Sequence, residues 1–256
     1  MSQIEEQRAL RRQVVQVCRL LYAKNMIFAS DGNVSVRWGT DYVIATPSGV
    51  HKGLLRPDDL VVTDLDGRIV SDRQNPDPKV GDEGRGKTTA SQGGLLPSAE
   101  LRLHLEVYRQ RPDVRAVVHA HPPITTALTV AGVSLAPCIL PETLVTLGQI
   151  VTTAYATPSS EQGPQVIREL IRDHDALVLD RHGAVTVGPT PLKAYMRMEK
   201  VENTAQVIQI ALTLGRLQTL PVAEVRKLSA IRNEMLGPER VFAGPDCRLC
   251  GACEGL

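Results

Sequence analysis

Short apolar runs joined by tight turns are the feature that most restricts how this chain can fold. Residues 34–44 alternate apolar and polar side chains on either side of a Gly-Thr-Asp turn, which is the pattern of a β-hairpin. Two further hairpins are predicted about the turns at residues 64–67 and 180–183, which read DLDG and DRHG. Because the strands of a hairpin run antiparallel, these turns predict a sheet that is at least partly antiparallel.

Amphipathic segments with helical spacing lie between these strands. Helices are predicted over residues 3–25 and 160–173, and over the long segment 191–217. Ser98 can cap the N-terminus of another helix, SAELRLHLEVYRQ, and a short helix is predicted after the proline pair at 122 and 123. Strands and helices alternate along the chain, which predicts an α/β fold of packed layers.

Composition argues against several classes of partner. Hydrophobic residues make up 43% and charged residues 22% of the 256 residues, so the chain can bury a substantial core. A net charge of +1 and only 3% aromatic residues argue against a nucleic-acid partner. The N-terminus is charged, and no apolar run approaches the roughly 20 residues that span a bilayer. We therefore expect a soluble, cytoplasmic protein that does not bind a membrane.

Two segments differ from the rest of the chain. Residues 71–95 are rich in Gly, Pro and charge, so we expect a flexible insertion within one domain of residues 1–240. Residues 241–256 form a tail in which Cys247, Cys250 and Cys253 are separated by two residues each. This spacing is typical of metal ligands, but a structural zinc needs a fourth. The tail is either a small metal site or a segment with incidental thiols.

Residues that can bind a metal follow predicted strands. In VRAVVHAHPP, His119 and His121 point to the same face because alternate residues of a strand share a face. His182 also follows an apolar strand, and Glu100 lies in the first turn of a predicted helix. Three imidazoles and one carboxylate form a normal shell for Zn²⁺, with Mn²⁺, Co²⁺ or Fe²⁺ as alternatives. Spacing alone leaves open whether the four converge or are polar residues at strand ends.

Four groups of motifs resemble those of the class II aldolase/adducin family. They are SDGNVSVR at 30–37, TPSG at 46–49, PSAELRLH at 97–104, and the histidine motifs VVHAH at 117–121 and DRHG at 180–183. The motifs follow the family order, and the resemblance covers the chain apart from the insertion and the tail. It implies a single-domain, three-layer α/β/α fold around a central, largely antiparallel sheet.

The resemblance also implies a zinc site and a phosphate site. Glu100, His119, His121 and His182 would bind zinc, and Glu100 would act as acid or base once substrate displaces it. The residues implied to bind the substrate and its phosphate are Gly32, Asn33, Thr46, Ser48, Gly49 and Ser98. Without the resemblance, the same residues are interpreted as ordinary turn and cap residues.

Three positions qualify this comparison. The aldolases usually have two serines before the glutamate, whereas this chain has Ser98 and then Ala99, so one phosphate-binding hydroxyl is missing. The fuculose phosphate aldolases, a branch of the family, take a proton-donating tyrosine from a neighbouring subunit, and Glu142 lies near that position. Both changes point away from fuculose 1-phosphate itself. His104, which those aldolases also carry, is interpreted as a core or helix-surface residue and not as a ligand.

The expected function is that of a zinc-dependent lyase in carbohydrate metabolism. It would cleave a C–C bond of a small keto-sugar phosphate by a retro-aldol reaction, through a metal-stabilised enediolate, to dihydroxyacetone phosphate and an aldehyde. Members of the family are typically homotetramers with active sites at subunit interfaces, and we expect the same here. The alternatives are a metal-dependent decarboxylase of a related hydroxy-keto acid and a non-catalytic, adducin-like assembly protein. Members of the latter kind usually lack the four ligands.

Overall fold

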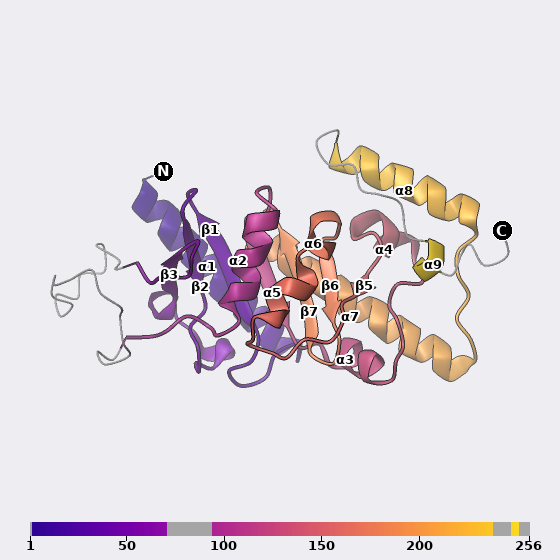
Figure 1. The fold of residues 1–256 in the computed structure, drawn as a ribbon, viewed down its shortest axis with the longest axis horizontal. Helices are drawn as coiled ribbons and strands as arrows, with labels where there is room; N and C mark the ends of the chain where they lie inside the picture. The colour runs from indigo at the N-terminus through magenta and orange to yellow at the C-terminus, as the bar shows by residue number, and fades with distance from the viewer. Residues whose placement is uncertain (1, 71–93, 238–246, 251–256) are drawn as a thin grey trace.

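The computed structural model describes residues 2–70, 94–237 and 247–250 of the chain (Figure 1). The predicted insertion lies outside the described residues except for residues 94 and 95, and the predicted tail does so except for 247–250. The elements in chain order are α1 (Gln3–Ala23), β1 (Asn33–Trp38), β2 (Tyr42–Ala45), η1 (Lys52–Leu54), η2 (Pro57–Asp59), β3 (Val61–Asp64), α2 (Leu101–Gln110), β4 (Ala116–Ala120), α3 (Pro123–Val130), α4 (Pro141–Thr146), β5 (Val151–Thr152), α5 (Gln162–Ile167), α6 (Leu170–Asp173), β6 (Ala176–Leu179), β7 (Gly183–Gly188), α7 (Pro191–Leu214), α8 (Val222–Leu236) and α9 (Cys247–Cys250).

The described strands form one sheet of seven, in the order β3-β2-β1-β4-β7-β6-β5. All neighbouring strands pair antiparallel except β5 and β6, which pair parallel. The prediction of a largely antiparallel central sheet is therefore confirmed. β4 is the middle strand, and its His119 lies between Asn33 of β1 and Val185 of β7.

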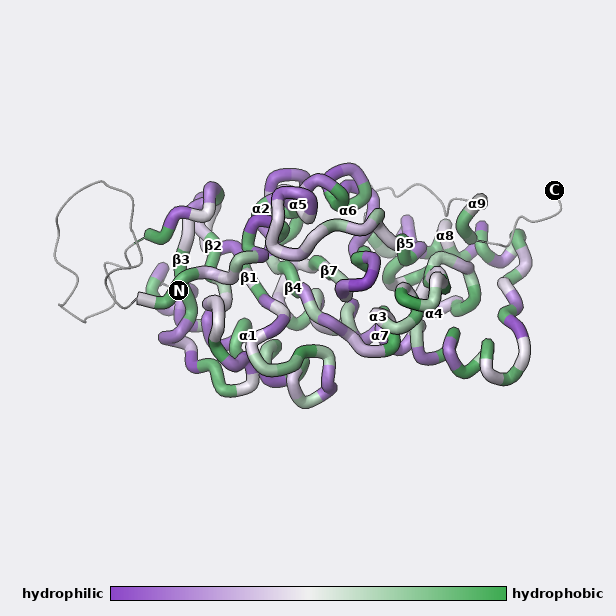
Figure 2. The backbone as a smooth tube through the Cα atoms, turned by 60° about the horizontal axis from the view of Figure 1, so that its bottom comes forward, coloured by the Kyte–Doolittle hydropathy of each residue, from purple (hydrophilic) through white to green (hydrophobic). Residues whose placement is uncertain are grey.

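Helices cover both faces of the sheet and make the fold three-layered, as predicted. Figure 2 shows α1 and α7 on one side of the sheet and α2, α5 and α6 on the other. Alternation along β4 sends Val118 and Ala120 into the core beneath α1 and α7, whereas Val117 packs in the core beneath α2, α5 and α6. His119 is two residues after Val117 in the same strand, so its side chain points to the same face of the sheet, the face covered by α2. Within the described residues, no helix is long and apolar enough to span a membrane.

Several local predictions need correction. The segment 160–173 contains two short helices, α5 and α6, although Arg168 and Glu169 between them keep helical backbone angles. The turn at 64–67 is present, but within the part of the chain that the structure describes its second arm pairs through a single isolated antiparallel bridge, between Thr63 and Ile69. Ser98 does not cap α2, because the helix begins at Leu101 with Glu100 at its N-cap. Glu100 is thereby fixed at the junction between a loop and a buried helix.

Candidate metal centre

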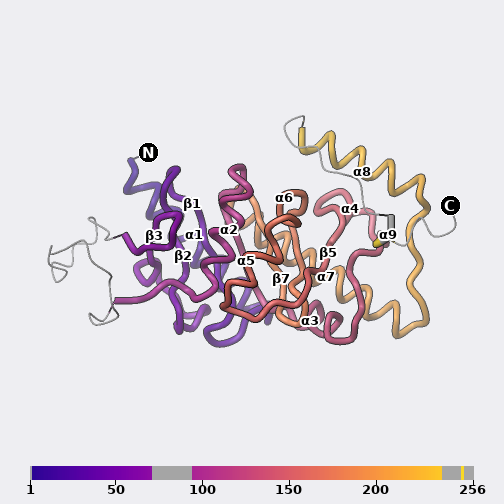
Figure 3. Tube along the Cα trace, in the orientation of Figure 1, coloured from indigo at the N-terminus to yellow at the C-terminus, as the bar shows by residue number. Residues whose placement is uncertain are grey.

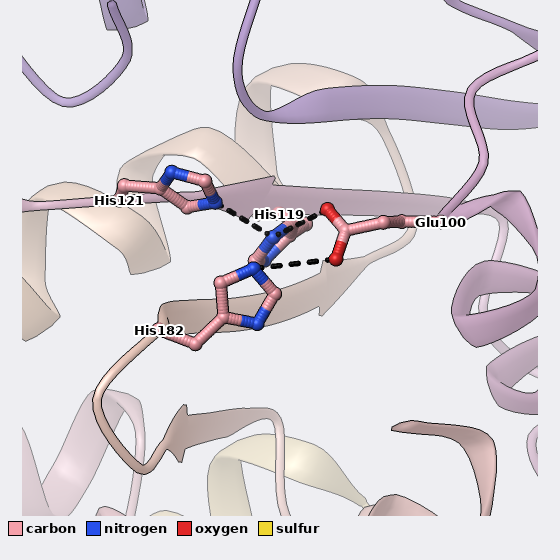
Figure 4. Close-up of side chains that lie close together, drawn as sticks. All are labelled: Glu100, His119, His121 and His182. Carbon is pink, nitrogen blue, oxygen red and sulfur yellow. Dashed lines mark hydrogen bonds and ion pairs between the residues drawn. The ribbon is translucent and has the colours of Figure 1, made fainter. Parts of the chain in front are cut away.

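Four side chains from three parts of the fold converge above the sheet (Figure 4). His119 is the penultimate residue of β4, and His121 follows the strand with its ring turned to the same side. His182 comes from the β6–β7 hairpin turn, and Glu100 from the N-terminus of α2. Their candidate ligand atoms all lie within 4.8 Å of one another. The predicted convergence is therefore present in the structure.

The distances between these atoms fit a single divalent ion. Nε2 of His119 lies 3.1 Å from Nε2 of His121 and 3.1 Å from Oε2 of Glu100. Nε2 of His182 lies 3.2 Å from Oε1 of Glu100. With zinc–nitrogen bonds of about 2.0–2.1 Å, the edge of a tetrahedral ligand shell is about 3.3 Å. Three contacts within the group are thus close to this edge length, and all the candidate ligand atoms lie within 4.8 Å of one another.

Backbone contacts hold this arrangement. Nδ1 of His119 donates to the carbonyl oxygen of Ala184 at 3.0 Å, so its Nε2 faces the other three side chains. Gly183, with φ +151°, lets the hairpin turn pass close to β4, because a Cβ there would lie 2.2 Å from the carbonyl oxygen of Ala120. A side chain at position 183 would therefore push His182 away from the cluster.

The electrostatic environment favours metal-binding protonation states. Burial raises the pKa of Glu100, but its hydrogen bond to His119 and the neighbouring imidazoles outweigh this effect and lower it to about 2. Burial, together with neighbouring imidazoles, lowers the pKa of His121 to about 3 and that of His182 to about 4. At neutral pH the carboxylate is ionised and these two imidazoles are neutral, which are the forms that bind a metal.

The predicted phosphate loops adjoin the four-residue cluster. Nδ2 of Asn33 donates to Oγ of Ser98 at 3.1 Å and to Oε2 of Glu100 at 3.4 Å. Asn33 is 4% exposed, and its Oδ1 has no hydrogen-bond partner among the described residues. Gly32 has φ +68°, and a Cβ there would lie 2.5 Å from Ile27. Loop 30–33 is thus built to approach the cluster closely.

The other two loops lie against each other. The amide of Ser98 donates to the carbonyl oxygen of Thr46 at 3.2 Å, and the amide of Ser48 donates to that of Leu96 at 2.8 Å. The hydroxyl of Thr46 is buried and accepts from the amide of Val34, so that hydroxyl has a structural partner. Ser48 and Gly49 are exposed, and Gly49 has φ +69°. The six predicted substrate-binding residues therefore lie in three adjoining loops, with Ser48 and Gly49 at the surface.

A cavity of about 410 Å³, open to solvent, borders the cluster. Glu100 and His182 contribute to its wall, and the remaining lining mixes apolar and polar side chains. The apolar lining residues include Ala99, Leu103, Pro158, Pro164, Val166 and Leu179, and the polar ones are Arg102, Thr153, Thr157, Ser159, Ser160 and Asp180. The cluster thus adjoins both the three loops and a cavity of mixed lining.

Comparison with known proteins identifies the family. The sequence profile of the family described as Class II Aldolase and Adducin N-terminal domain matches residues 12–209. The chain belongs to this family. An L-fuculose phosphate aldolase of Methanocaldococcus jannaschii is 30% identical over 206 residues, which cover 80% of this chain and 99% of the relative. A 3-oxo-tetronate 4-phosphate decarboxylase of Escherichia coli K12 is 29% identical over 208 residues, covering 80% and 88%.

Solved structures agree with this class II aldolase assignment. The crystal structure of YgbL from Escherichia coli, described as an aldolase, epimerase or decarboxylase, has 27% sequence identity and a TM-score of 0.72. The match covers 89% of this chain and 99% of YgbL. The relatives are enzymes of the class II aldolase type, and this chain is an enzyme of that type. The alternative of a non-catalytic assembly protein is set aside.

Sequence reasoning missed Lys52, which connects two of the class II aldolase loops. Its side chain is 1% exposed, and Nζ donates to three carbonyl oxygens: Ser30 at 2.8 Å, Val50 at 2.9 Å and Pro47 at 3.1 Å. One buried cation thereby ties the loop before Asn33 to the TPSG loop. A sequence does not show which backbone carbonyls a side chain will contact. The role of Lys52 is therefore visible only from its buried position in the structure.

His104 and Glu142, the two other residues singled out in the sequence, lie in the core and at the surface. His104 is buried, and its Nδ1 lies 2.7 Å from Oγ of Ser35, which also contacts the hydroxyl of Tyr108 at 2.8 Å. It therefore lies in the core, as interpreted from the sequence. Glu142 is exposed in the first turn of α4, which packs against α7 and α8. It does not belong to the four-residue cluster of its own chain.

Proposed function

We propose that this enzyme is a metal-dependent lyase that cleaves a C–C bond of a small keto-sugar phosphate by a retro-aldol reaction. Its products would be dihydroxyacetone phosphate and an aldehyde. The observation that carries the proposal is the convergence of Glu100, His119, His121 and His182 beside three loops of the kind that bind phosphate. The phosphorylated substrates named for the aldolase and decarboxylase relatives agree with it.

We propose that the three histidines and Glu100 hold the metal, with zinc as the first candidate. Three neutral nitrogen ligands and one carboxylate are a donor set that zinc prefers, and Mn²⁺, Co²⁺ and Fe²⁺ accept the same set. Without a cation, each of these contacts of about 3 Å needs a proton between its two atoms, and a bound cation would take the place of those protons. When bound, such an ion supplies Lewis-acid polarisation of the substrate carbonyl.

The loops next to the cluster would bind the phosphate. The N–H group of Gly49 and the hydroxyls of Ser48 and Ser98 offer donors on exposed or half-buried turns, and the N–H group of Gly32 offers one on a buried turn. The side chain of Asn33 joins this site to the metal site through Ser98 and Glu100. Phosphate binding in this position would orient the carbonyl end of the substrate relative to Glu100.

Retro-aldol cleavage needs two proton transfers. The hydroxyl on the carbon β to the carbonyl loses its proton as the C–C bond breaks, and the carbon left as an enediolate must gain one. Glu100 borders the cavity and is ionised at neutral pH, so in the cleavage direction it would first take up a proton from solvent and then deliver it to the carbon. Glu142 of the partner subunit would exchange the proton on the departing oxygen. Its exposure on α4 agrees with a role across an interface of a homotetramer.

The cavity beside the cluster would receive the aldehyde half of the substrate. Leu103 and Leu179 offer apolar contacts to its carbon chain, and polar lining residues such as Ser159 and Asp180 offer hydrogen-bond partners to its hydroxyl groups. The lining therefore accepts an aldehyde that carries both apolar carbons and hydroxyl groups.

Metal removal tests this function. We expect chelation to abolish cleavage in a panel of keto-sugar phosphates and zinc add-back to restore it. His121→Ala should lose bound metal and activity while remaining folded, whereas His174→Ala, at the opposite end of β6, should keep both. Full metal occupancy in the His121→Ala protein would contradict the ligand assignment, and activity that survives complete chelation would contradict the metal-dependent reaction.

The decarboxylase relative supports a second candidate reaction on the same site. Loss of CO₂ from a β-keto acid leaves the same kind of enediolate, so the described side chains serve either reaction. The products separate the two. Release of CO₂ from a hydroxy-keto acid phosphate, with no aldehyde formed from any keto-sugar phosphate, would favour the decarboxylase.

A further inference from the structure

Helix α3 follows directly after one histidine of the cluster and contacts the strand that begins directly after another. It starts at Pro123, two residues after His121, and packs against α7 and β7 (Figures 1 and 3). The imidazole rings of His121 and His182 have their centroids 4.9 Å apart. The helix is thus in a position to influence both rings.

The start of α3 is held by a carboxylate from another helix. Pro123 has no N–H group, so the N–H groups left without a partner inside the helix are those of Ile124 and Thr125. Both donate to the carboxylate of Glu202 in α7 at 2.9 Å. The hydroxyl of Thr125, which is fully buried, donates to the same carboxylate at 2.7 Å. Glu202 therefore takes the place of an N-cap side chain, which Pro122 cannot supply, and ties the start of α3 to α7.

The other end of α3 is hydrogen-bonded to the turn between β6 and β7. The hydroxyl of Thr129, which is 6% exposed, accepts from the amide of Arg181 at 3.0 Å. Arg181 has φ +56°, a left-handed conformation that residues other than glycine rarely adopt. Such a conformation persists only where neighbouring contacts hold it. Because His182 is the next residue, Thr129 supports the backbone that directs this imidazole toward the cluster.

We propose that Glu202 and Thr129 are positioning residues, which act through α3 to set the spacing of His121 and His182. The inference rests on the proposed metal site and adds to it two residues that are not themselves in the cluster. Contacts that hold a ligand near its bound position raise metal affinity, because less free energy is spent on ordering it. One short helix, fixed to α7 at its start and to the hairpin turn near its end, would order two ligands together.

A role in stability alone is the other explanation of these contacts. Buried hydrogen bonds stabilise a fold wherever they lie, and their loss would lower the Tm of the metal-free protein. Metal affinity separates the two explanations, since it is measured on protein that is already folded. A residue that only stabilises the fold leaves the affinity unchanged, whereas loss of a contact that orients a metal ligand typically weakens binding about 10–100-fold.

The zinc affinity of metal-free protein, measured by competition with a chromophoric chelator below the Tm of every variant, tests Thr129. Thr129→Val keeps the shape of the side chain but removes the hydroxyl, and it should weaken zinc binding about tenfold. Thr129→Ser keeps the hydroxyl and should bind zinc as the wild type does. Thr204→Val is the matched control and should also keep the wild-type affinity. Thr204 is likewise buried in a helix, and its hydroxyl lies 3.0 Å from that of Thr143 in α4.

The same measurement tests Glu202. In Glu202→Gln one carboxylate oxygen becomes an NH₂ group, which cannot accept from the start of α3, so we expect zinc binding to weaken about tenfold. Glu199→Gln, one turn earlier in α7, should keep the wild-type affinity, because Glu199 accepts from Tyr195 of its own helix at 2.7 Å. Bound Co²⁺ should show an altered visible d–d absorption in Glu202→Gln and Thr129→Val but not in the two controls.

Two results would overturn the proposal. The first is wild-type zinc affinity and an unchanged cobalt spectrum in both Thr129→Val and Glu202→Gln, which would leave these residues a structural role only. The second is zinc binding as weak in Thr129→Ser as in Thr129→Val, because the hydroxyl would then not be the group that matters. If Thr129→Val does not fold, Glu202→Gln and its control decide.

His121→Ala separates failure of this proposal from failure of the proposed function. If His121→Ala keeps its zinc, the metal site is wrongly assigned and the role of α3 falls with it. If His121→Ala loses zinc while Thr129→Val and Glu202→Gln bind it as tightly as the wild type, the metal site stands and only the role of Glu202 and Thr129 is wrong.

Discussion

Replacing Lys52 by methionine is predicted to loosen the phosphate loops without removing any substrate ligand. Methionine keeps most of the buried volume and the apolar contacts of the lysine stem. It removes the three charge-assisted hydrogen bonds from Nζ to the carbonyl oxygens of Ser30, Pro47 and Val50. The two loops then lose their shared anchor.

The size of the effect follows from these contacts. Each hydrogen bond to a charged group contributes about 1.5–3 kcal/mol, so three sum to roughly 4–9 kcal/mol in the absence of any cost. Burial of the ammonium opposes this, as the lowered pKa of Lys52 indicates, and the freed carbonyls regain water if the loops open. We therefore expect a net loss of about 3 kcal/mol, which corresponds to a fall in Tm of about 6–12 °C for a chain of this size.

Thermal unfolding and steady-state kinetics on a keto-sugar phosphate measure this prediction. Looser phosphate loops should raise KM about tenfold with a smaller change in kcat, because contacts to the phosphate contribute equally to ground and transition states. Lys24→Met, at an exposed lysine, is the control and should change neither quantity. If Lys52→Met keeps the wild-type Tm and KM, Lys52 does not hold the loops and the reasoning is refuted.

Two further variants test the charges that support the fold. Burial raises the pKa of Glu106, but hydrogen bonds from Arg168 and Gln110 lower it overall, so its ionised form stabilises the protein above the unfolded-state pKa. Glu106→Gln should cost about 1 kcal/mol at pH 7, with the difference shrinking below about pH 4.3 in urea titrations; a constant difference down to pH 2 would contradict this sign. Asp175 is fully buried and ion-paired with three arginines, Arg111, Arg197 and Arg232. Asp175→Asn should lower the unfolding free energy by about 3 kcal/mol in chemical denaturation. A loss below about 1 kcal/mol would show that burial of the three arginines does not depend on the charge of Asp175.

Local periodicity was sufficient to predict the parts of the site that depend on one element. Alternation along β4 placed His119 and His121 on one side, and the DRHG turn placed His182 at a hairpin, and both are present in the structure. The convergence with Glu100 could not be derived from spacing, because it depends on how α2 lies across the sheet. The prediction that Glu100 joins the histidines came from the resemblance of the ordered motifs to those of the family.

Other features depend on contacts that leave no trace in the sequence. Ser98 was predicted to cap α2, but its hydroxyl accepts weakly from the amide of Glu100 at 3.4 Å and also contacts Asn33. The role of Lys52 depends on backbone carbonyls, and the contact between Cys138 and Cys250 depends on the return of the chain more than a hundred residues later. Contacts of this kind are set by tertiary packing, which residue type alone does not encode.

A crystal structure of the zinc-loaded enzyme with a non-cleavable keto-sugar phosphate is the most direct test of the central claim. We predict a zinc anomalous peak among His119, His121 and His182, with the phosphate bound by the loops around Gly32, Gly49 and Ser98. A fully occupied metal site elsewhere, with no peak among these histidines, would contradict the account. So would a phosphate bound outside the three loops.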